Sequence, residues 1–418
     1  MKILFLSDNF PPEGNAPATR LYEHAVRWVK AGHTVTVVTC APNFPEGKLF
    51  PGFRNSWRQV EDVDGIRVVR VKSYITANDG FVRRSLDYLS FMAMGFAMSL
   101  LEAQPDVVVA TSPQFFAAFA GWAVSVFKRR PFVFELRDLW PASIVAVGAM
   151  VESPVIALLE KVERFLYRRA DAVVAVTEAF RTDLISRGIP RYKIHVVSNG
   201  VDLQRYKPLP RDAQLELELG LRGKFVVGYL GTHGLAHALP NVLEAATLLR
   251  ERADIVFLFA GAGSERAKLE RLAQDRGLPN VRLLPRQPKE KLPGLWSVCS
   301  ITVVPLRNSP VFSTVIPSKI FEAMAMGVPI LMSVPEGEAT SIVRQTGAGV
   351  CVPPENPQAM AAEIERLAST KTEVSQLRLN ALRAAPRFSR DELAERMVRV
   401  LQSCARQRAD TPAAEVAQ

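Results

Sequence analysis

Short runs of β-branched and aromatic residues alternate with helix-like segments along almost the whole chain of 418 residues. The runs include KILFLS, HTVTVVT, DVVVA, FVFEL and AVVAV in the first half, and KFVVGYLG, DIVFLFAG, ITVVPL and PILMSV in the second. Runs that are apolar throughout are typical of parallel strands that helices cover on both faces. The pattern therefore predicts an α/β fold with two doubly wound, Rossmann-like domains.

The boundary between the two domains is predicted at a proline-rich segment, residues 203–211, because proline does not suit a helix interior or a central strand. We expect a first domain over residues 1–203 and a second over residues 204–386. Residues 387–418 begin with helical periodicity, so we expect a helix that packs back toward the first domain, followed by a frayed tail.

The cysteines, the N-terminus and the net charge narrow the kind of protein that this chain can be. The four cysteines form no CxxC pair and no Cys/His cluster, so neither a zinc site nor a disulfide framework is predicted. The N-terminus reads as a strand rather than a secretory signal, so we expect a cytoplasmic protein. The formal charge of +10 is spread over both halves. Such charge suits nucleotide diphosphates, acidic lipids or nucleic acid without choosing among them.

One stretch carries a single charge. Residues 86–101, LDYLSFMAMGFAMSLL, contain Asp87 and follow Arg83 and Arg84. The stretch is too short to span a bilayer, which takes about 20 apolar residues. It is either a helix buried in the first domain or an interfacial helix that dips into a membrane.

Loops at strand ends are the first places to look for ligand binding, because the following helix N-termini offer N–H groups to anions. In the first domain, NFPPEGNAPATR follows the first strand and places Gly14 ahead of a helix that carries Arg20. Backbone amides and the guanidinium could both face a phosphate there. A flexible loop with a solvated arginine is the alternative.

In the second domain, GYLGTHGLAHALP surrounds a strand end with glycines, and we predict that Gly231, Thr232, His233 and His237 cradle a diphosphate. The two histidines lie four residues apart, but no third ligand stands near them, so we expect no metal there. The later loop AGAGSER lacks the third glycine of a dinucleotide fingerprint.

The triplet Asp62-Val63-Asp64 is of a kind that can hold a metal-bound diphosphate. It precedes Gly65 between two strand-like runs, so we expect a hairpin turn. We therefore predict neither a metal nor a cofactor. The P-loop, GxSxG and HExxH motifs do not occur, so their usual activities lose support.

The most specific segment is PSKIFEAMAMGVPIL, residues 317–331. It predicts a helix that opens near Lys319, so that Ser318, Lys319 and the helix N-terminus attract an anion. Glu322 lies one turn further, where its carboxylate can accept hydrogen bonds from two ribose hydroxyls. Lys319 and Glu322 could instead be an ordinary surface pair.

Together these segments resemble the large family-four retaining glycosyltransferases with the GT-B architecture. The resemblance covers nearly the whole length and rests on SDNFPPEGNAPATR, GHTVTVVT, ELRDLWP, VSNGVD, GYLGTHGLAHAL and PSKIFEAMAMGVPIL. The last is similar to the C-terminal part of the family's E-x7-E motif, with Glu322 as the second glutamate. ELRDLWP and GTHGLAH look like bacterial enzymes that assemble O-antigen, capsule or colanic acid, including N-acetyl-fucosamine-type transferases.

The chain departs from the family pattern at several positions. Thr314 stands where relatives carry the first glutamate of E-x7-E, beside the donor sugar. His237 stands where many relatives place a lysine that grips the diphosphate, and Arg137-Asp138 lie near the place of a cleft histidine. Charge neutralisation is then expected from Arg137, Lys319 and backbone amides.

The resemblance implies two domains facing a cleft, of which the second binds the nucleotide and the first presents the acceptor. It implies transfer from a nucleotide-diphosphate donor, a UDP-sugar, with retention of configuration. The implied acceptor is a hydroxyl of a lipid-linked saccharide in surface polysaccharide assembly, including O-antigen and lipopolysaccharide. We expect catalytic roles for Arg137, Asp138 and Lys319, and an acceptor-side role for Arg20. The expected donor-binding residues are Gly14, Gly231, Thr232, His233, His237, Arg286, Thr314, Ser318, Lys319 and Glu322.

Peripheral contact with the inner face of the cytoplasmic membrane is also expected, whereas nucleic acid binding is not. Two other functions stay open. A sugar-nucleotide epimerase or phosphorylase of this fold would share the anion loops, and an epimerase would need no acceptor. A non-catalytic, membrane-docked subunit would keep the fold and lose donor turnover, and Thr314 is the residue that favours it.

Overall fold

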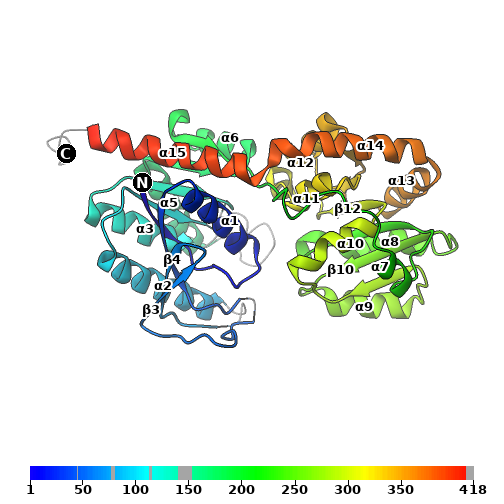
Figure 1. Cartoon of the computed structure of the whole chain (residues 1–418), viewed down its shortest axis with the longest axis horizontal. Coiled ribbons are helices and arrows are strands. Elements are labelled where there is room, and N and C mark those ends of the chain that lie inside the picture. Colours follow the sequence, from blue (N-terminus) through cyan, green and yellow to red (C-terminus); the bar gives the residue numbers. More distant parts are fainter. Residues whose placement is uncertain (45, 77–80, 113–114, 140–152, 411–418) are drawn as a thin grey trace. The chain divides into compact units, whose positions relative to one another are not determined.

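The computed structural model describes residues 1–44, 46–76, 81–112, 115–139 and 153–410, which belong to two compact units (Figure 1). Unit 1 comprises Met1–Ser198 and Asp391–Gln418, and unit 2 comprises Asn199–Arg390. The change of unit therefore comes a few residues before the predicted boundary at 203/204. The reason is that Val201 pairs with Ser389 in an isolated bridge and donates its N–H to the carbonyl of Phe388 at 2.9 Å, both within unit 2.

The described strands of unit 1 form one sheet in the order β3-β4-β2-β1-β5-β6-β7-β8. Their bounds are β1 Lys2–Leu6, β2 Thr34–Cys40, β3 Arg58–Val63, β4 Ile66–Val71, β5 Val107–Thr111, β6 Phe132–Leu136, β7 Ala172–Ala175 and β8 Ile194–Val196. The helices are α1 Ala16–Lys30, α2 Phe81–Leu101, α3 Phe115–Lys128, α5 Pro154–Arg169, α6 Glu178–Ser186 and α15 Arg390–Asp410, with a 3-10 turn η1 at Arg191–Lys193. All neighbouring strands are parallel except β3 and β4.

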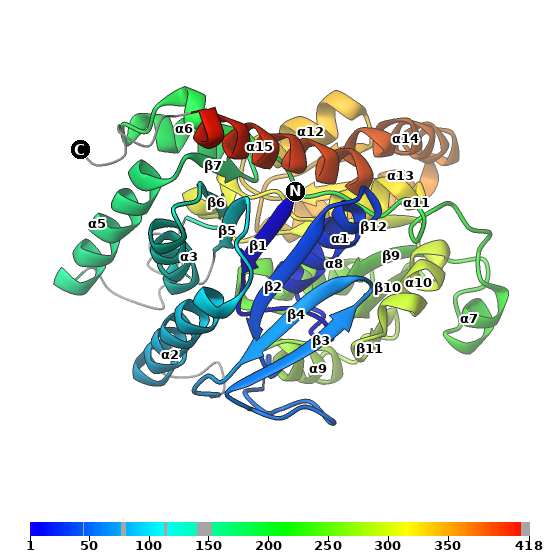
Figure 2. The same ribbon diagram turned by 60° about the vertical axis from the view of Figure 1, so that its left-hand side comes forward.

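Helices cover both faces of this sheet, as the apolar runs predicted. In β1, Ile3 and Phe5 join a core with α1 and α15, whereas Leu4 and Leu6 join a core with α2, α3 and α5 (Figure 2). Successive side chains of a strand point to opposite faces, so a strand buried on both sides must be apolar throughout. The indole N–H of Trp28 in α1 donates to the carbonyl of Ala394 in α15 at 2.9 Å.

The triplet Asp62-Val63-Asp64 lies at a hairpin, as predicted: Asp62 and Val63 end β3, and Asp64 and Gly65 form the turn. Val63 pairs with Ile66 across the antiparallel strands β3 and β4, and the Gly65 N–H donates to Asp62 Oδ1 at 3.0 Å. Asp64 has a φ of 54°, the left-handed conformation that such turns require. The triplet therefore belongs to the end of a strand and the turn that follows it.

Helix α2 contains the nearly uncharged stretch, and neither of the two simple interpretations describes it fully. Phe91 is buried against the sheet, but Leu86, Leu89 and Leu101 are 49%, 40% and 68% exposed. The helix thus packs one side into the core and turns a row of apolar side chains outward. Among the described residues, no helix has the length and hydropathy needed to cross a membrane.

Unit 2 contains a second parallel sheet, with described strands in the order β11-β10-β9-β12-β13-β14. The strands are β9 Phe225–Leu230, β10 Ile255–Ala260, β11 Val281–Leu284, β12 Ile301–Pro305, β13 Ile330–Ser333 and β14 Gly349–Cys351. The helices are α7 Ala213–Glu218, α8 Leu239–Leu248, α9 Arg266–Asp275, α10 Leu292–Val298, α11 Lys319–Met326, α12 Glu338–Thr346, α13 Pro357–Ser369 and α14 Lys371–Ala384. Short 3-10 helices are η2 Leu235–His237, η3 Lys289–Lys291, η4 Pro310–Thr314 and η5 Ala385–Phe388.

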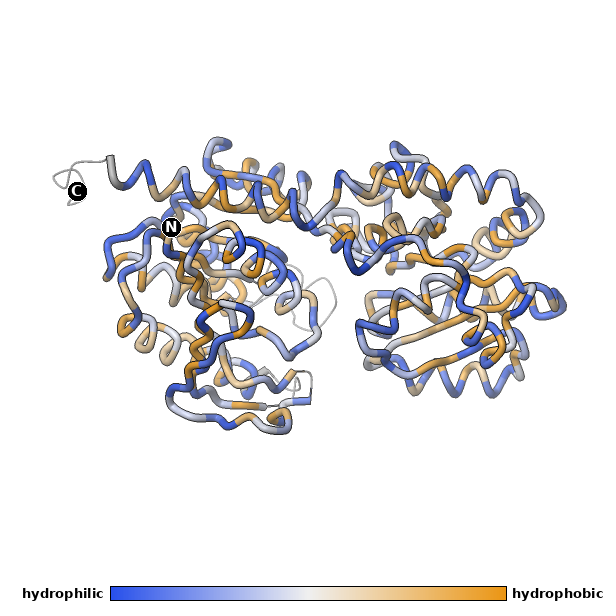
Figure 3. The backbone as a smooth tube through the Cα atoms, viewed as in Figure 1, coloured by the Kyte–Doolittle hydropathy of each residue, from blue (hydrophilic) through white to orange (hydrophobic). Residues whose placement is uncertain are grey.

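Strand β9 again divides its side chains between two cores. Val227 and Tyr229 pack with α8 and α13, and Val226 and Leu230 pack with α10 and α11. Hydrophobic residues accordingly concentrate in the strands of each unit (Figure 3). Both units have the predicted doubly wound α/β architecture.

Candidate functional site

Two loops meet at the carboxyl end of the unit 2 sheet, where β9 and β10 end. The N–H of Gly231 donates to the carbonyl of Ala260 at 2.9 Å, and the N–H of His233 donates to that of Ala262 at 2.9 Å. A Cβ on Gly261 would lie 1.8 Å from the Gly231 oxygen, so only glycine allows this approach. The sequence predicted the glycine loop but not its partner.

Lys319 begins helix α11 beside these loops. Ser318 precedes it, and no side chain caps the first turn of the helix. Lys319 Nζ is buried, lies 3.8 Å from the centre of the Tyr229 ring, and has no hydrogen-bond partner among the described residues. Burial lowers the pKa of the Lys319 side chain, and the charge of Glu322 raises it in part, so that the resulting pKa is about 7. A Cβ on Gly231 would lie 3.0 Å from Nζ, so the ammonium lies against the loop.

The two histidines of the loop are held neutral. His233 is fully buried, and its carbonyl accepts the Glu265 N–H at 2.9 Å. Burial lowers its pKa to about 4, with Arg266 and Lys319 adding to the shift. His237 is half-buried, and burial followed by the Lys319 charge lowers its pKa to about 3. His233 contributes its backbone N–H and carbonyl to the loop, and neither of its ring nitrogens has a hydrogen-bond partner among the described residues, whereas Thr232 is exposed at the tip.

Tyr229, which no motif had indicated as a site residue, lies within this cluster. Its hydroxyl donates to the Thr232 carbonyl at 2.6 Å. Its ring centre lies 5.8 Å from that of His233 and 6.1 Å from that of His237. The only signal in the sequence was the position of the residue, two before the glycine loop.

The remaining donor-site candidates lie on the same α11 turn or on neighbouring loops. Glu322 is half-buried on α11. Thr314 ends η4 and donates its hydroxyl to the Val311 carbonyl at 2.8 Å. Arg286 is exposed in the loop after β11. The loop after β12 is tied to the glycine loop, because Arg307 donates its N–H to the Ala236 carbonyl at 2.9 Å.

Arg20 in unit 1 does not face an open surface, which corrects the expectation of an acceptor-side role. Its side chain is 1% exposed, and its Nε donates to Glu135 at 2.9 Å. The other two nitrogens donate to the carbonyls of Ser198 and Val197 at 2.7 and 2.8 Å. The guanidinium therefore ties α1 to the ends of β6 and β8 inside the unit.

The other unit 1 candidates lie near strand ends. Arg137 and Asp138 follow β6, are half-buried, and donate their N–H groups to Ser112 Oγ at 2.7 and 3.3 Å. The Trp140 and Pro141 of the ELRDLWP segment lie outside the described residues. Gly14 is half-buried before α1.

An acidic group that the motifs did not predict lies at the end of β1. Burial raises the pKa of Asp8 to about 8, with Glu13 and Asp87 adding to the rise. Burial likewise raises the pKa of Asp87 to about 7. Asp8 lies two residues after the end of β1 at Leu6, and this position was the available signal.

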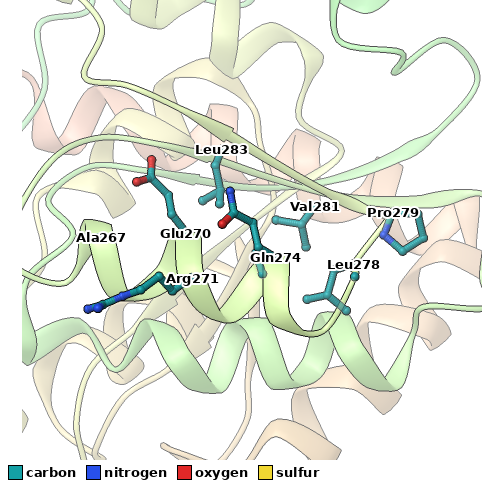
Figure 4. Close-up of a pocket in the computed structure, with 10 residues that line it drawn as sticks. Ala267, Glu270, Arg271, Gln274, Leu278, Pro279, Val281 and Leu283 are labelled. Atoms are coloured by element: carbon teal, nitrogen blue, oxygen red, sulfur yellow. The ribbon is translucent and has the colours of Figure 1, made fainter.

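Two further observations limit the site. Among the described residues, no three His, Cys, Asp or Glu side chains come together to hold a metal. A shallow groove lies between α9 and β11, lined by Glu270, Gln274, Leu278 and Val281 (Figure 4). It includes residues before β11, at the amino end of the strand, so it is distinct from the loop cluster around Lys319.

Comparisons with known proteins cover most of the chain. The family "Glycosyl transferase 4-like domain" matches residues 15–200, and "Glycosyl transferases group 1" matches residues 218–384. One relative is WcaI of Escherichia coli, whose name describes it as a glycosyl transferase of colanic acid biosynthesis. It is 26% identical over 378 residues, which cover 88% of this chain and 92% of that protein. WbjE of Pseudomonas aeruginosa, named as a glycosyltransferase, is 27% identical over 260 residues, 61% of this chain and 62% of that protein.

Solved structures share the fold at lower identity. Sucrose-phosphate synthase from Thermosynechococcus elongatus superposes with a TM-score of 0.78 at 17% identity, covering 96% of this chain and 98% of that one. HepE of Anabaena, in complex with UDP-glucose, gives a TM-score of 0.69 at 20% identity, covering 96% of this chain and 100% of that one. The sequence matches and the two parallel-sheet units agree, and the chain is a member of the family-four glycosyltransferases with the GT-B fold.

Proposed function

We propose that this glycosyltransferase moves a sugar from a UDP-sugar, with retention, to a hydroxyl of a lipid-linked saccharide in surface polysaccharide assembly. The observation that carries the proposal is the buried Lys319 ammonium, which lies against the Gly231 loop without a hydrogen-bond partner among the described residues. Burial lowers the pKa of Lys319 to about 7, so the side chain is only partly charged at neutral pH, and a bound diphosphate would stabilise its charged form. The WcaI name and the HepE complex with UDP-glucose support the polysaccharide and donor parts.

In the proposed reaction, the bond between the sugar C1 and the diphosphate oxygen breaks while the acceptor oxygen bonds to C1 on the same face. The acceptor proton passes to the departing diphosphate, so no protein nucleophile is needed. Lys319 and the uncapped start of α11 stabilise the charge that develops on the diphosphate. Glu322 binds the ribose hydroxyls, Arg286 lies near the base, and Arg137 and Asp138 remain proposed catalytic residues.

Replacing Lys319 tests this role. We expect Lys319→Met to lower transfer from the cognate UDP-sugar by about 10²-fold, the effect of losing one charge-stabilising donor. Lys371→Met is the matched control, because Lys371 also begins a helix, α14, but is exposed. Wild-type transfer rates in Lys319→Met would contradict the proposal.

The donor is identified by thermal shifts of the wild-type chain with UDP-, GDP-, dTDP- and ADP-sugars, because a ligand that binds only the folded state raises the melting temperature. We expect stabilisation by UDP and one UDP-sugar. Product analysis without acceptor then distinguishes a transferase from an epimerase, because release of an altered nucleotide sugar would indicate an epimerase.

We further propose that transfer needs no metal, so activity should survive a strong chelator. Complete loss of activity on chelation, followed by restoration with magnesium or manganese, would refute this.

The exposed apolar face of helix α2 supports the proposal that the acceptor is lipid-linked. Leu86 and Leu89 are 49% and 40% exposed on a helix that has Arg83 and Arg84 in its first turn. An interfacial helix binds by apolar burial together with attraction to acidic headgroups. We propose that this face contacts the inner leaflet of the cytoplasmic membrane.

Co-sedimentation with vesicles tests the membrane contact. We expect the chain to bind anionic vesicles, and Leu86→Gln/Leu89→Gln to bind several-fold less. Leu217→Gln/Leu248→Gln is the control, because these unit 2 leucines are at least as exposed, at 72% and 50%. Equal binding by the two double variants, or no binding by the wild-type chain at low salt, would assign the α2 face another role.

A further inference from the structure

Tyr229 contacts both the glycine loop after β9 and the lysine that begins α11. It lies at the end of β9, is 1% exposed, and carries the Lys319 ammonium 3.8 Å from its ring centre. Its hydroxyl donates to the Thr232 carbonyl at 2.6 Å, at the tip of the Gly231 loop. One side chain therefore contacts both the cation and the loop that the proposed function assigns to the diphosphate.

We propose that Tyr229 is a positioning residue for the diphosphate: its ring face holds the Lys319 ammonium beside the Gly231 loop, and its hydroxyl fixes the loop. The inference rests on the proposed function. It adds the residue that keeps the cation in place while no donor is bound.

The choice of a ring in place of a carboxylate has a physical reason. An aromatic face attracts a cation through its quadrupole without supplying a negative charge. A buried carboxylate at the same place would neutralise the ammonium and compete with the diphosphate. The other titratable groups around Lys319 are His233 and His237, from the loop after β9, which are neutral at pH 7, and Glu322 on α11, whose charge only partly offsets the effect of burial.

If Tyr229 served only to fill the core, the loss of another buried ring should have the same effect on catalysis. The ring also packs in the apolar core, 6.2 Å from the ring centre of Phe259 on β10. Phe259 is as buried as Tyr229, and no cation–π contact joins it to Lys319 among the described residues. Phe259→Leu is therefore a matched control that removes a core ring and leaves the ammonium contact intact.

The experiment measures kcat and KM for the UDP-sugar between pH 6 and pH 9 in Tyr229→Phe, Tyr229→Leu, Tyr229→Met and Phe259→Leu. We expect Tyr229→Leu and Tyr229→Met to raise KM about tenfold, within the range of a desolvated cation–π contact. We also expect the rise in KM at alkaline pH to begin at lower pH, because the ring favours the charged lysine. Tyr229→Phe keeps the ring, so its pH profile should match the wild-type profile, with KM raised only a few-fold by the freed Thr232 carbonyl.

Phe259→Leu should lower the melting temperature and leave KM and the pH profile unchanged. The inference is overturned if Tyr229→Leu and Tyr229→Met keep the wild-type KM and pH profile, or if Phe259→Leu changes them equally. Met is included because its flexible chain fills irregular space if Leu does not fold. Failure of the proposed function looks different, since wild-type chain would then neither bind UDP nor turn over any UDP-sugar.

Discussion

Arg20 and Lys319 are both cations removed from water near strand ends, yet their surroundings differ. Arg20 is paired with Glu135 and two carbonyls. Lys319 has an aromatic face and no hydrogen-bond partner among the described residues. A cation whose donors are all used holds a structure together, whereas one whose donors are open can take an anion. The first is therefore read as structural and the second as functional.

Arg20→Leu should destabilise unit 1 by about 3–5 kcal/mol, because it leaves the Glu135 carboxylate buried without its counter-charge. Urea denaturation measures the loss. Arg20→Leu/Glu135→Leu should recover much of it, since neither charge is then buried alone. If Arg20→Leu instead raised only the acceptor KM, at unchanged stability, the acceptor-side role would be restored.

Glu322→Ala should weaken UDP-sugar binding by about 1.5–3 kcal/mol, the contribution of hydrogen bonds to a charged group. Isothermal titration with the cognate donor measures it. Glu251→Ala is the control, because Glu251 is 91% exposed in its side chain on unit 2. Unchanged affinity in a folded Glu322→Ala protein would remove Glu322 from the donor site.

Among the elements, α15 shows how a terminal helix completes a distant core. Met397 and Leu401 are fully buried with strand residues of the first sheet, at the opposite end of the chain. The sequence predicted the helix and its direction of packing, and the contacts of Trp28 with Ala394 and of Arg27 with Asp391 fasten it to α1.

Leu401→Ala should cost unit 1 about 2–5 kcal/mol, because it removes buried methyl groups and leaves a cavity. Thermal or urea unfolding measures the change. Arg399→Ala, two residues away on the exposed side of the same helix, should stay within about 0.5 kcal/mol of wild type. Equal effects of the two substitutions would mean that α15 does not contribute to the core.

At the scale of the whole molecule, the largest pKa shifts of the two units predict opposite effects of pH on stability. In unit 1, burial raises the pKa of Asp8 to about 8 and that of Glu163 to about 7. The folded unit then binds more protons than the unfolded chain above pH 4, so its stability falls as the pH rises toward 8. In unit 2, the lowered pKa values of His233 and His237 mean that the unfolded chain binds more protons below pH 6.5. Stability of unit 2 therefore falls as the pH drops.

We expect unit 1 to be more stable at pH 5 than at pH 8, and unit 2 to be more stable at pH 8 than at pH 5. Trp296 is the single tryptophan of unit 2, so the difference in emission between the wild-type chain and Trp296→Phe during urea unfolding follows that unit. The Trp296→Phe chain alone reports on unit 1. Parallel pH trends in the two signals would contradict the prediction.

The sequence by itself determined the architecture and the family. Parallel strands are buried on both faces, so each one consists of an unbroken run of apolar residues. Such a run can be recognised in the sequence without knowledge of the fold. The hairpin at Asp62-Val63-Asp64 was equally local, since the turn and its glycine are adjacent in the chain. Segments such as PSKIFEAMAMGVPIL then carried the family resemblance.

Only the tertiary structure determined which buried cations are paired within the protein and which can bind an anion. Arg20 and Lys319 look alike in sequence, because each lies in the first two turns of a helix that follows a strand-end loop. Glu135, which pairs with Arg20, lies 115 residues away, and the ring that contacts Lys319 at the start of α11 belongs to Tyr229 of strand β9. Burial and charge pairing depend on which distant segments the sheet brings together, and no local pattern records them.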